Sequence, residues 1–388
     1  MNGTRFMEKL LDGIEVEWTV LGNERFVEIS NSGRKPVKAS LRTAGKTPYY
    51  GANNIQDYVD GHTHDGEFVL IAEDGSASLD NYSIQYATGK FWANNHVHVI
   101  RGRAELNTRF LYHCLCIVNF IPFLSGGVRS KLTKGKLVNI PVPILCPETP
   151  QKSLEIQAKI VRILDSFTEL TAELTAELTA RKKQYNYYRD QLLSFDEGET
   201  EWMTLNEVCS SITAGGDLPE NHAKGQTESS EKFPYPIYAN ATGDKGLYGF
   251  TDGYKIASDA VTISARGAKI GYHTVRKGKF TPIIRLITLV PNKNIISTRY
   301  LNYILDMTPI GGTDGGIPQL TVPTVKKISI PVPAVAEQGR IVAILDKFDA
   351  LTNSITEGLP REIGLRQKQY EYYRDLLLSF PKPEEVTA

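Results

Sequence analysis

The sequence has little of what defines several large classes of protein. It has only four cysteines in 388 residues and no CxxC pair, which argues against a disulfide framework or a zinc module. No apolar run approaches the ~20 residues that cross a bilayer. The N-terminus reaches Glu8 and Lys9 without an apolar signal segment, so we expect a cytoplasmic protein with no membrane partner. We expect reduced, mostly buried thiols at Cys114, Cys116, Cys146 and Cys209.

An excess of one charge is missing as well. The chain has 44 Lys and Arg against 44 Asp and Glu, a net charge of zero. A neutral chain is not a bulk electrostatic binder of nucleic acid, so any DNA contact has to come from local patches. With 41% hydrophobic residues the chain can build ordinary cores, and its length suits about two to four domains.

Sequence signatures of an enzyme are also absent. Gly45-Lys46-Thr47 resembles the end of a phosphate-binding loop, but the glycine required five residues earlier is replaced by Ser40. There is no methyltransferase motif of the Asn/Asp-Pro-Pro-Tyr/Phe type and no glycine fingerprint for a cofactor. We therefore expect neither a catalytic residue nor a cofactor on this chain.

Two histidine pairs, His62/His64 and His96/His98, have a spacing that puts both members on one face of a strand. Such a pair could supply two metal ligands, but no third and fourth ligand stands at a helpful spacing. Ordinary loop or strand histidines are the simpler interpretation, and His96 and His98 could alternatively lie near a DNA surface. We predict no metal site.

What the sequence does contain is a repeat. RKKQYNYYRDQLLSF at 181–195 and RQKQYEYYRDLLLSF at 366–380 are identical at 12 of 15 positions. Upstream, KIVRILDSFTELT at 159–171 and RIVAILDKFDALT at 340–352 are identical at 8 of 13 positions, and Ile-Pro-Val-Pro begins at both Ile140 and Ile330. Two copies of one unit, separated by dissimilar stretches, suit a two-part or pseudo-symmetric partner.

Both copies have the periodicity of a long helix. Apolar residues step by three and four, as in the a/d stripe of a coiled coil, and we expect the two helices to pack antiparallel. Tyrosines on this stripe are better explained by helix packing than by stacking on a ligand. To this helix–helix and partner-subunit interface we assign Ile160, Phe167, Leu170, Leu174, Leu178, Tyr185 and Tyr188 in the first copy, and Ile341, Phe348, Leu351, Tyr370 and Tyr373 in the second.

The two helices differ by one tetrad. Asp165 and Tyr185 are 20 residues apart, whereas the equivalent Asp346 and Tyr370 are 24 apart. Four added residues would lengthen a helix by roughly 6 Å and rotate its face by about 40°. The first helix carries Thr-Ala-Glu-Leu twice, at 171–178, whereas Gly358, Pro360 and Gly364 in the second predict a bend or a break.

The stretches between the helices, 16–148 and 200–334, are rich in Gly, Pro, Thr, Tyr and Asn and contain short β-type runs. They match weakly in order. Pro48-Tyr49-Tyr50 aligns with Pro236-Ile237-Tyr238, a strand ending in Gly75 aligns with one ending in Gly267, and Leu132 aligns with Leu320. Each stretch is predicted to be a β-rich module with some helix.

The start of the chain resembles the segment that leaves the first helix. Leu10-Leu11-Asp12-Gly13 up to Trp18 is similar to Leu192-Leu193 up to Trp202, which predicts a circular arrangement with both chain ends close together. The expected fold is mixed α+β: two globular β-rich domains separated by two long antiparallel coiled-coil helices, in a pseudo-two-fold circular repeat. The predicted boundaries are 1–148, 149–195, 196–334 and 335–388.

These motifs resemble a known family, the specificity subunits of type I restriction-modification systems. The likeness covers the whole architecture and rests on the Thr-Ala-Glu-Leu pair, the two QY-x-YYRD-x-LLSF blocks, the Ile-Pro-Val-Pro entries and the segment before Trp18. The Thr-Ala-Glu-Leu pair points to the subfamily whose central helix carries such tetrapeptides. The modules between the helices contribute little to the likeness, as expected if they differ among relatives.

The resemblance implies two target recognition domains, each reading one half of a split, asymmetric DNA site, with the paired helices as a ruler between them. It implies that the helices dock two adenine-N6 methyltransferase subunits, and that this methylase recruits two motor/nuclease subunits. S-adenosylmethionine, ATP and Mg would then belong to the partner subunits. The second helix departs from the pattern because it lacks the tetrads and carries Pro360.

The strongest local signal for DNA reading lies in the second module. A strand runs into a glycine-bounded loop at 264–273, and five Lys/Arg stand among residues 266–279 without an Asp or Glu. Arginine can bind guanine bidentately and lysine can meet phosphate, although a solvated basic hairpin fits the same pattern. The candidates in this module are Arg266, Lys269, Tyr272, His273, Asn240, Lys245 and Gln319.

The counterpart loop in the first module, 72–76, is acidic, which suits a cytosine amino group better than phosphate. Nearby basic residues restore positive charge. Asn53, like Asn240, is either an adenine reader or part of a polar turn. The candidates in this module are Asn53, Ser76, Asn94, Asn95, Arg129 and Lys131.

A competing interpretation is a protein-interaction scaffold that does not bind DNA and uses the modules as adaptors. The neutral charge favours it, and the helix motifs oppose it.

Overall fold

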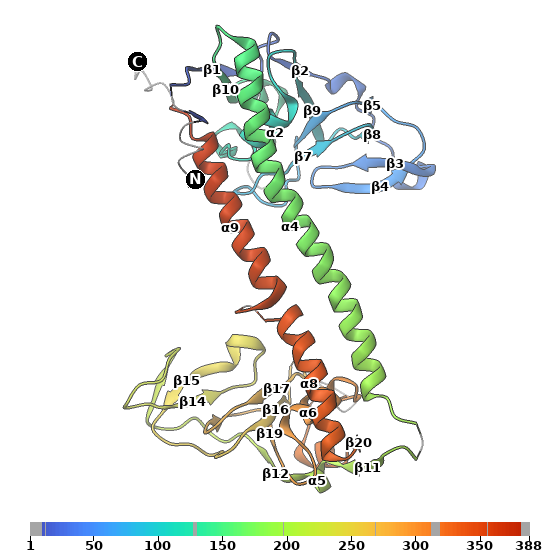
Figure 1. The fold of residues 1–388 in the computed structure, drawn as a ribbon, viewed down its shortest axis with the longest axis vertical. Coiled ribbons are helices and arrows are strands. Elements are labelled where there is room, and N and C mark those ends of the chain that lie inside the picture. The colour runs from blue at the N-terminus through green and yellow to red at the C-terminus, as the bar shows by residue number, and fades with distance from the viewer. Residues whose placement is uncertain are drawn as a thin grey trace. The chain divides into compact units, whose positions relative to one another are not determined.

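The structure, a computed structural model, describes residues 10–11, 13–126, 130–196, 198–267, 269–311, 319–354 and 356–381, without the side chains of Asp244 and Lys245. The chain divides into two compact units. Unit 1 comprises residues 1–175 and 362–388, and unit 2 comprises residues 176–361. Each unit combines one β-rich module with part of each helical copy (Figure 1).

The module of unit 1 contains two four-stranded sheets, ordered β2-β9-β6-β7 and β4-β3-β8-β5, and a separate pair of β1 with β10. Strand β6 is buried along its whole length because it is a central strand made of apolar residues, and helix α2 packs against β6 and β7. The strands are β1 (Val16–Val20), β2 (Val27–Ile29), β3 (Ala44–Tyr50), β4 (Ile55–Val59), β5 (His64–Asp65), β6 (Phe68–Ala72), β7 (Ile84–Ala87), β8 (Lys90–Ala93), β9 (Val97–Gly102) and β10 (Pro141–Leu145). The short helices are η1 (Asn31–Gly33), η2 (Ala39–Leu41), α2 (Thr108–Leu115), η3 (Ile121–Phe123) and α3 (Lys134–Leu137).

The module of unit 2 also contains two four-stranded sheets and a separate strand pair. Its sheets are ordered β12-β19-β16-β17 and β13-β15-β14-β18, β11 pairs with β20, and helix α6 packs against β16 and β17. The strands are β11 (Glu201–Thr204), β12 (Cys209–Ala214), β13 (His222–Lys224), β14 (Tyr235–Tyr238), β15 (Leu247–Thr251), β16 (Ala260–Ser264), β17 (His273–Arg276), β18 (Thr281–Pro282), β19 (Leu286–Pro291) and β20 (Ser329–Val332). The helices are α5 (Leu205–Val208), η4 (Gly243–Gly246), α6 (Thr298–Asp306) and α7 (Val322–Lys326).

The first sheets of the two modules share strand order and register, whereas the second sheets differ in their fourth strand: β5 pairs with β8, but β13 pairs with β15. Strands β6 and β9 pair antiparallel with Val69 opposite Ile100, and β16 and β19 pair with Val261 opposite Leu289. A parallel pair, β3 with β8 and β14 with β18, stands next to an antiparallel neighbour in each second sheet. The predicted mixed α+β fold with two β-rich modules is therefore confirmed.

The first helical copy is one continuous helix. Helix α4 (Pro150–Leu193) has 44 residues, which corresponds to about 65 Å of helix. It runs through both Thr-Ala-Glu-Leu tetrads, where the hydroxyls of Thr171 and Thr175 donate to the carbonyl oxygens four residues earlier at 2.8 and 2.7 Å. Ile160 is buried, and Phe167, Leu170, Leu174 and Leu178 are half-buried on the predicted stripe.

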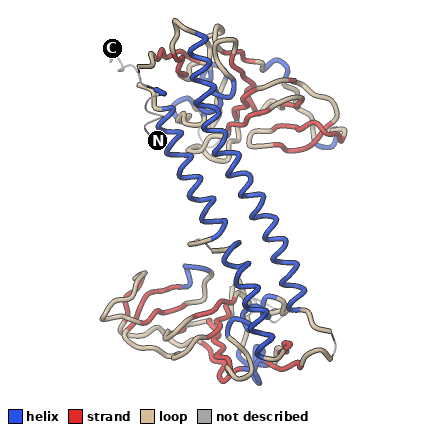
Figure 2. Tube along the Cα trace, viewed as in Figure 1, coloured by secondary structure: helices blue, strands red, loops and turns tan. Residues whose placement is uncertain are grey.

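The second helical copy is broken, not lengthened. Helix α8 (Val335–Thr352) ends before helix α9 (Gly358–Leu378) begins (Figure 2), so the extra tetrad is used in the interruption. Gly358 has φ +76°, and a Cβ there would collide with the carbonyl oxygens of Ala350 and Leu351. Pro360 lies in the first turn of α9, where a missing N–H costs no helical hydrogen bond.

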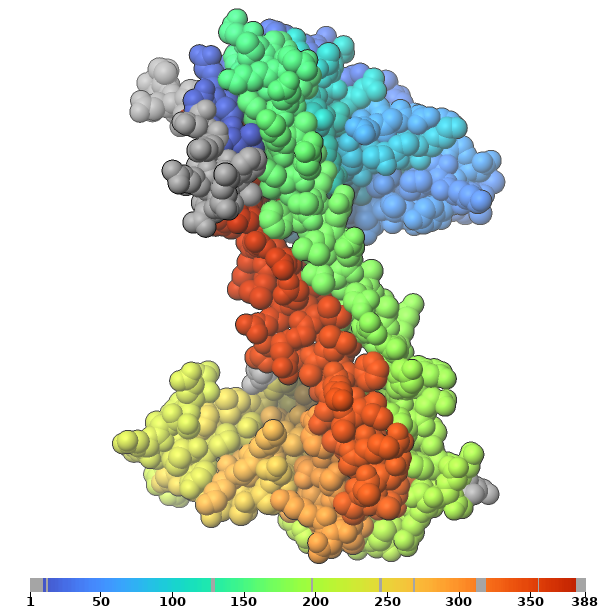
Figure 3. All heavy atoms as spheres, viewed as in Figure 1, coloured from blue at the N-terminus to red at the C-terminus, as the bar shows by residue number. Residues whose placement is uncertain are grey.

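Within each unit α4 packs antiparallel against the second copy. In unit 1 the ring of Phe167 stacks on Tyr373 with centroids 5.3 Å apart, and Ile160 shares one apolar cluster with Leu377 and Tyr370. In unit 2 the ring of Phe348 lies 5.6 Å from Tyr188 and 6.3 Å from Tyr185. There, Ile341 is buried and Leu351 is half-buried. In unit 1, α4 and α9 lie side by side with outward faces open to solvent (Figure 3).

The joint between helix and module is duplicated as well. Gln157 is buried and its side-chain oxygen accepts from the amide of Asn107 at 2.7 Å, at the start of α2. Gln338 makes the same contact with the amide of Ser297 at 2.9 Å, at the start of α6. Eight residues later along each helix, Asp165 binds Arg109 and His113, and Asp346 binds Arg299 and Tyr303. The repeat therefore builds the same polar anchor twice.

The predicted closeness of the chain ends holds for the residues described. The indole N–H of Trp18 donates to the carbonyl oxygen of Pro381 at 2.7 Å, and the ring of Phe380 lies 6.5 Å from that of Phe110. None of the helices in the described ranges has both the length and the apolar character that crossing a bilayer requires.

Candidate nucleic-acid interface

One edge of each module is built from three loops held by the same hydrogen bonds. In unit 1 the amide of Glu73, after β6, donates to the carbonyl of His96, after β8, at 2.8 Å, and the amide of Leu132 donates to the carbonyl of Glu73 at 2.7 Å. In unit 2 the amide of Ala265 donates to Arg285 at 3.0 Å, and that of Leu320 to Ala265 at 2.8 Å. We name these edges edge 1 (residues 73–76, 94–96 and 130–131) and edge 2 (residues 265–267, 283–285 and 319).

Because the bonds are equivalent, residues of edge 1 can be matched one by one with residues of edge 2. Glu73 corresponds to Ala265 because their amides and carbonyls make the same bonds. Asp74 corresponds to Arg266 because both form an isolated β-bridge, Asp74 with Lys131 and Arg266 with Gln319. His96 corresponds to Arg285 through the shared carbonyl bond. Gly75 and Gly267 come next, with φ +70° and +95°, a conformation that glycine adopts without strain. The backbone is thus the same, while the side chains differ.

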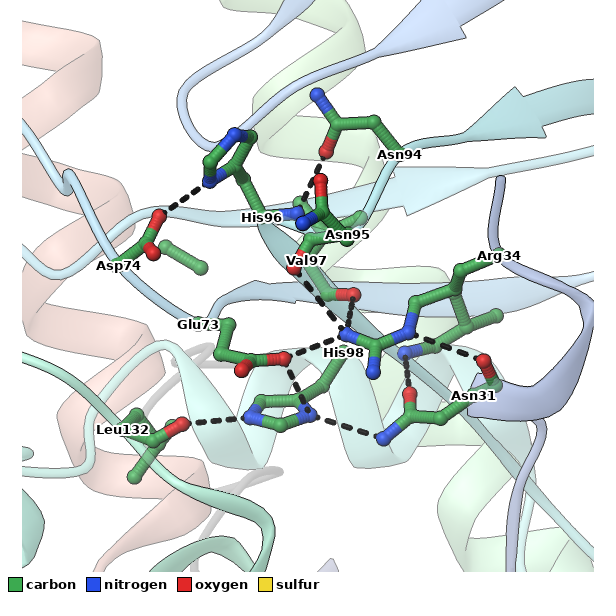
Figure 4. A network of polar contacts seen from close by, with 12 residues as sticks. Asn31, Arg34, Glu73, Asp74, Asn94, Asn95, His96, Val97, His98 and Leu132 are labelled. Atoms are coloured by element: carbon green, nitrogen blue, oxygen red, sulfur yellow. Dashed lines mark hydrogen bonds and ion pairs between the residues drawn. The ribbon is translucent and has the colours of Figure 1, made fainter. Parts of the chain in front are cut away.

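Edge 1 is stiffened by a polar network around His98 (Figure 4). The His98 ring is buried, its Nε2 donates to the carbonyl of Leu132 at 2.7 Å, and its Nδ1 accepts from the side-chain Nδ2 of Asn31 at 3.0 Å. Glu73 accepts from Arg34 at 2.6 Å and from Lys131 at 3.0 Å. The network therefore ties together four segments that are far apart in the sequence.

The network sets the charge states of its members. Burial lowers the pKa of His98, more than the Leu132 carbonyl raises it, so the ring is held neutral. Burial alone would raise the pKa of Glu73, but hydrogen bonds from Arg34 and Lys131 outweigh it and keep the carboxylate charged. On the solvent side the Nδ1 of His96 lies 2.5 Å from a carboxylate oxygen of Asp74.

The predicted candidates of unit 1 all lie on or beside edge 1 where they are described. Asn95 and Lys131 are exposed, whereas Asn94 is buried and accepts from the amide of His96 at 2.8 Å. Asn53 spans a turn, donating to the carbonyl of Gly75 and accepting from the amide of Ala77. Ser76 bonds to Ser78 and Ser83 in the same loop. Arg129 lies outside the described residues.

In unit 2 the candidates divide into two groups. Arg266, Gln319 and Asn240 meet at edge 2, where Asn240 donates to the carbonyl of Arg266 and accepts from the amide of Ala265. Lys269 is exposed in the following turn.

The second group faces other parts of unit 2. The hydroxyl of Tyr272 accepts from the amide of Gly243 at 3.1 Å. His273 turns toward α6, with its Nε2 3.1 Å from the carbonyl of Asn302 and 3.3 Å from Asp306. Lys245 lies in η4, and its side chain is outside the described part.

Comparison with known proteins gives the family. The chain matches the type I restriction modification DNA specificity domain twice, over residues 15–181 and 197–365. The chain belongs to the type I restriction-modification specificity subunits. A Haemophilus influenzae protein described as a type I restriction enzyme specificity subunit is 46% identical, over 98% of this chain and 99% of its own length. The Escherichia coli EcoR124I/EcoR124II specificity subunit is 37% identical over the full length of both chains.

The fold is shared with solved structures. A crystal structure of the type I restriction-modification S subunit of Mycoplasma genitalium superposes with a TM-score of 0.66 at 17% identity, covering 96% of this chain and 98% of the other. A specificity subunit recognises DNA sequence, so the two matched edges of this subunit are the natural candidates for that contact.

Sequence reasoning missed one basic segment of this specificity subunit. Residues 34–46 contain five Lys/Arg and no acid, the same count that drew attention to 266–279. The segment adjoins edge 1, because Lys38 and Arg42 line a concave site of about 430 Å³ together with Asn95 and His96. The guanidinium of Arg42 lies 4.1 Å over the ring of Tyr49, a cation–π contact. Counting charges along the first module would have found it.

Among the described residues no three His, Cys, Asp or Glu side chains come together as a metal site. His64 stacks on Phe91 with centroids 5.2 Å apart and bonds to the carbonyl of Ser30. His98 is held in the Glu73 network. Burial raises the pKa of the Cys116 thiol to about 11 and that of Cys209 to about 12, so both behave as inert apolar groups.

The two units of the subunit should respond to pH in opposite directions. Burial lowers the pKa of His98 and His113 in unit 1 below the usual 6.5. As the pH falls below about 6.5, these histidines take up protons more readily in the unfolded chain, so the free energy of unfolding of unit 1 decreases. The pKa of His273 in unit 2 is raised by Asp306 and Gly271 in spite of burial, so its contribution is complete below about 6.5 and is lost as pH rises through the higher folded value.

Amide hydrogen exchange between pH 5.5 and 8, corrected for intrinsic rates, measures this. We expect protection of β9 to rise with pH and protection of β17 to fall. His98→Asn should flatten the first slope and His273→Asn the second. Parallel slopes in both units would contradict the assignment of these charge states.

Proposed function

We propose that each module of this specificity subunit reads one half of a split, asymmetric DNA site, while its helices set the spacer and dock two methyltransferase subunits. The observation that carries the proposal is the structural correspondence between edge 1 and edge 2. Their backbones are held by the same hydrogen bonds, yet Asp74 stands where Arg266 stands, and Asn95-His96 where Ile284-Arg285 stand. A common frame with different side chains suits two different half-sites.

The spacer part of the proposal rests on α4. The helix is unbroken through both Thr-Ala-Glu-Leu tetrads, and each tetrad adds about 6 Å, against 3.4 Å per base pair. A subunit with a different number of tetrads would therefore present its modules to DNA at a different spacing. The two tetrads support assignment of the chain to the subfamily whose central helix carries such repeats.

The docking part rests on a duplicated surface. Tyr187 and Tyr372 occupy the same position of the repeat and are 62% and 56% exposed. Each ring contacts the next tyrosine edge-on, at 5.4 Å and 5.2 Å, and is followed by an Arg–Asp pair, 189–190 or 374–375. Packing does not demand identical side chains at exposed positions. Two equal aromatic patches suit two copies of one partner.

The remaining parts of the proposal concern partners. The methylase formed with two methyltransferase subunits would recruit two motor/nuclease subunits, and S-adenosylmethionine, ATP and Mg would be bound by those partners, with no catalytic residue on this chain. Residues 1–148 and 196–334 would act as the recognition domains, and 149–195 and 335–388 as the helical scaffold. Affinity would come largely from phosphate contacts by loops such as 34–46.

An adaptor scaffold that does not touch DNA is the alternative. The neutral net charge favours it. Local basic segments at both edges weigh against it, because a binder of DNA needs positive charge only where it meets the duplex.

Replacing Arg266 with Ala tests the reading role of edge 2. We expect the assembled methylase to lose discrimination at one base pair of the second half-site by roughly 5- to 150-fold, the value of a bidentate base contact. Methylation frequency across a library of duplexes with randomised half-sites measures the effect. Lys293→Ala is the matched control, because it removes an exposed positive charge beyond the other end of β19. Unchanged preference in Arg266→Ala would remove this residue from the reading set.

A further inference from the structure

The turn between β18 and β19 holds an arginine in an unusual backbone conformation. Arg285 has φ +67°, in the left-handed region that side-chain-bearing residues avoid and glycine accepts readily. Among the described residues, Cys146 is the other non-glycine residue with a positive φ, and its side chain is buried. Arg285 is exposed. Burial therefore does not account for an arginine at this position.

The frame of the module does not require this conformation. His96 occupies the matched position of edge 1, its carbonyl accepts the same hydrogen bond, and it is not among the residues with positive φ. The left-handed turn is thus particular to unit 2. Strained residues that persist against an easy alternative are a feature of functional sites.

The surroundings of Arg285 leave its guanidinium available. Its backbone carbonyl accepts from the amide of Ala265, one residue before Arg266 and beside the bridge to Gln319. Within the described part of the chain the guanidinium makes neither a hydrogen bond nor an ion pair, so its donors point to no internal partner. The adjacent Ile284 is 53% exposed. The guanidinium of Arg285 has five N–H donors, and the exposed side chain of Ile284 lies next to it in the sequence. This combination is complementary to a guanine edge next to a thymine methyl group.

The comparison of the two edges distinguishes a base contact from a phosphate contact. Phosphates are alike in every half-site, so residues that bind them can be the same in both modules, whereas base readers have to differ. Positions 95–96 and 284–285 differ completely, Asn-His against Ile-Arg, within one hydrogen-bond frame.

We propose that Arg285 is a specificity-determining residue that binds a guanine of the second half-site in the major groove, a role that rests on the proposed function of the modules. Arg285 is exposed in a left-handed turn, and its backbone carbonyl is bonded to Ala265, the residue before Arg266. At position 285 a glycine would then favour the stability of the fold, whereas arginine favours DNA recognition, and both effects can be measured.

The test uses the full chain assembled with its methyltransferase subunits, in four forms: unchanged, Arg285→Gly, Arg285→Lys and Lys293→Ala. Glycine fits the left-handed turn, so Arg285→Gly should keep or raise the midpoint of thermal unfolding, by up to roughly 4 °C. Methylation of a duplex library with randomised half-sites should lose preference at one base pair of the second half-site by roughly 5- to 150-fold. Arg285→Lys keeps the charge but loses the bidentate fork, so it should lose the same preference while retaining more of the overall affinity.

The possible outcomes separate base reading from the alternatives. Relaxed preference at one base pair without loss of thermal stability supports the proposal. Equal weakening on all sequences overturns it in favour of a phosphate contact, and unchanged preference or a lower unfolding midpoint overturns it in favour of a structural role. Lys293→Ala should keep the preference, which separates the effect of the Arg285 variants from a general loss of positive charge. If the unchanged complex shows no sequence preference at all, the proposed function itself fails.

Discussion

Deleting Thr175-Ala176-Glu177-Leu178 is expected to change where the assembled methylase acts while leaving both half-sites readable. The deletion removes one tetrad from α4 without breaking the helical periodicity, because four residues are close to one turn. It shortens the helix by about 6 Å and rotates the C-terminal part of α4 by about 40°. Since a base pair rises 3.4 Å, the preferred spacer should shrink by one or two base pairs.

Mapping of N6-methyladenine after incubation with duplexes of graded spacer length measures this. Methylation at the original spacer should fall by at least about 100-fold, because two phosphate- and base-contact surfaces can no longer engage together. The matched control keeps the length and changes the chemistry: Thr175→Ser with Glu177→Gln should leave the spacer unchanged. A deletion variant that keeps the original spacer would remove α4 from the ruler role.

Tyr372→Ala and Tyr187→Ala are each expected to remove one methyltransferase subunit from the complex. Both rings are exposed on equal patches of the repeat, and a buried interfacial tyrosine typically contributes about 2 kcal/mol or more, roughly 30-fold in affinity. At concentrations where the unchanged chain binds two copies, each single variant should bind one and the double variant none. Mass measurement of the assembled complex under native conditions gives the stoichiometry.

The neighbouring positions 186 and 371 provide the control. Asn186 and Glu371 are exposed and differ between the copies, so Asn186→Ala and Glu371→Ala should leave both partners bound. Equal loss in controls and variants would point to a damaged helix. Full binding by the double tyrosine variant would assign partner docking to another surface.

The framework of the protein could be predicted from its sequence because the framework is repeated. Matched spacing of Asp165 with Asp346 and of Tyr185 with Tyr370 reveals two helices and the one-tetrad difference between them. How that difference is absorbed depends on local conformation: the left-handed turn at Gly358 lets the chain leave α8 and restart as α9. Glycine and proline in the region allow both a bend and a break, so the pattern alone leaves the choice open.

The correspondence between edge 1 and edge 2 was harder to predict, because it depends on backbone hydrogen bonds and hardly on side chains. Gly75 and Gly267 could be matched as turn residues. Nothing in the sequence aligns His96 with Arg285. Their correspondence appears only in the structure, where the carbonyl of His96 accepts from the amide of Glu73 and the carbonyl of Arg285 accepts from the amide of Ala265. The basic residues 34–46 reach edge 1 from an earlier part of the chain, so their charge is separated in the sequence from the loops that follow the strands.

We propose above all a reading of two separated half-sites by two modules on one chain. Its most direct test is a map of N6-methyladenine in genomic DNA exposed to the full chain assembled with its methyltransferase subunits. We expect one asymmetric motif of two specified segments, separated by a spacer of fixed length and free sequence, with one methylated adenine in each segment. A continuous motif without an unspecified spacer, or two segments at variable distance, would contradict it.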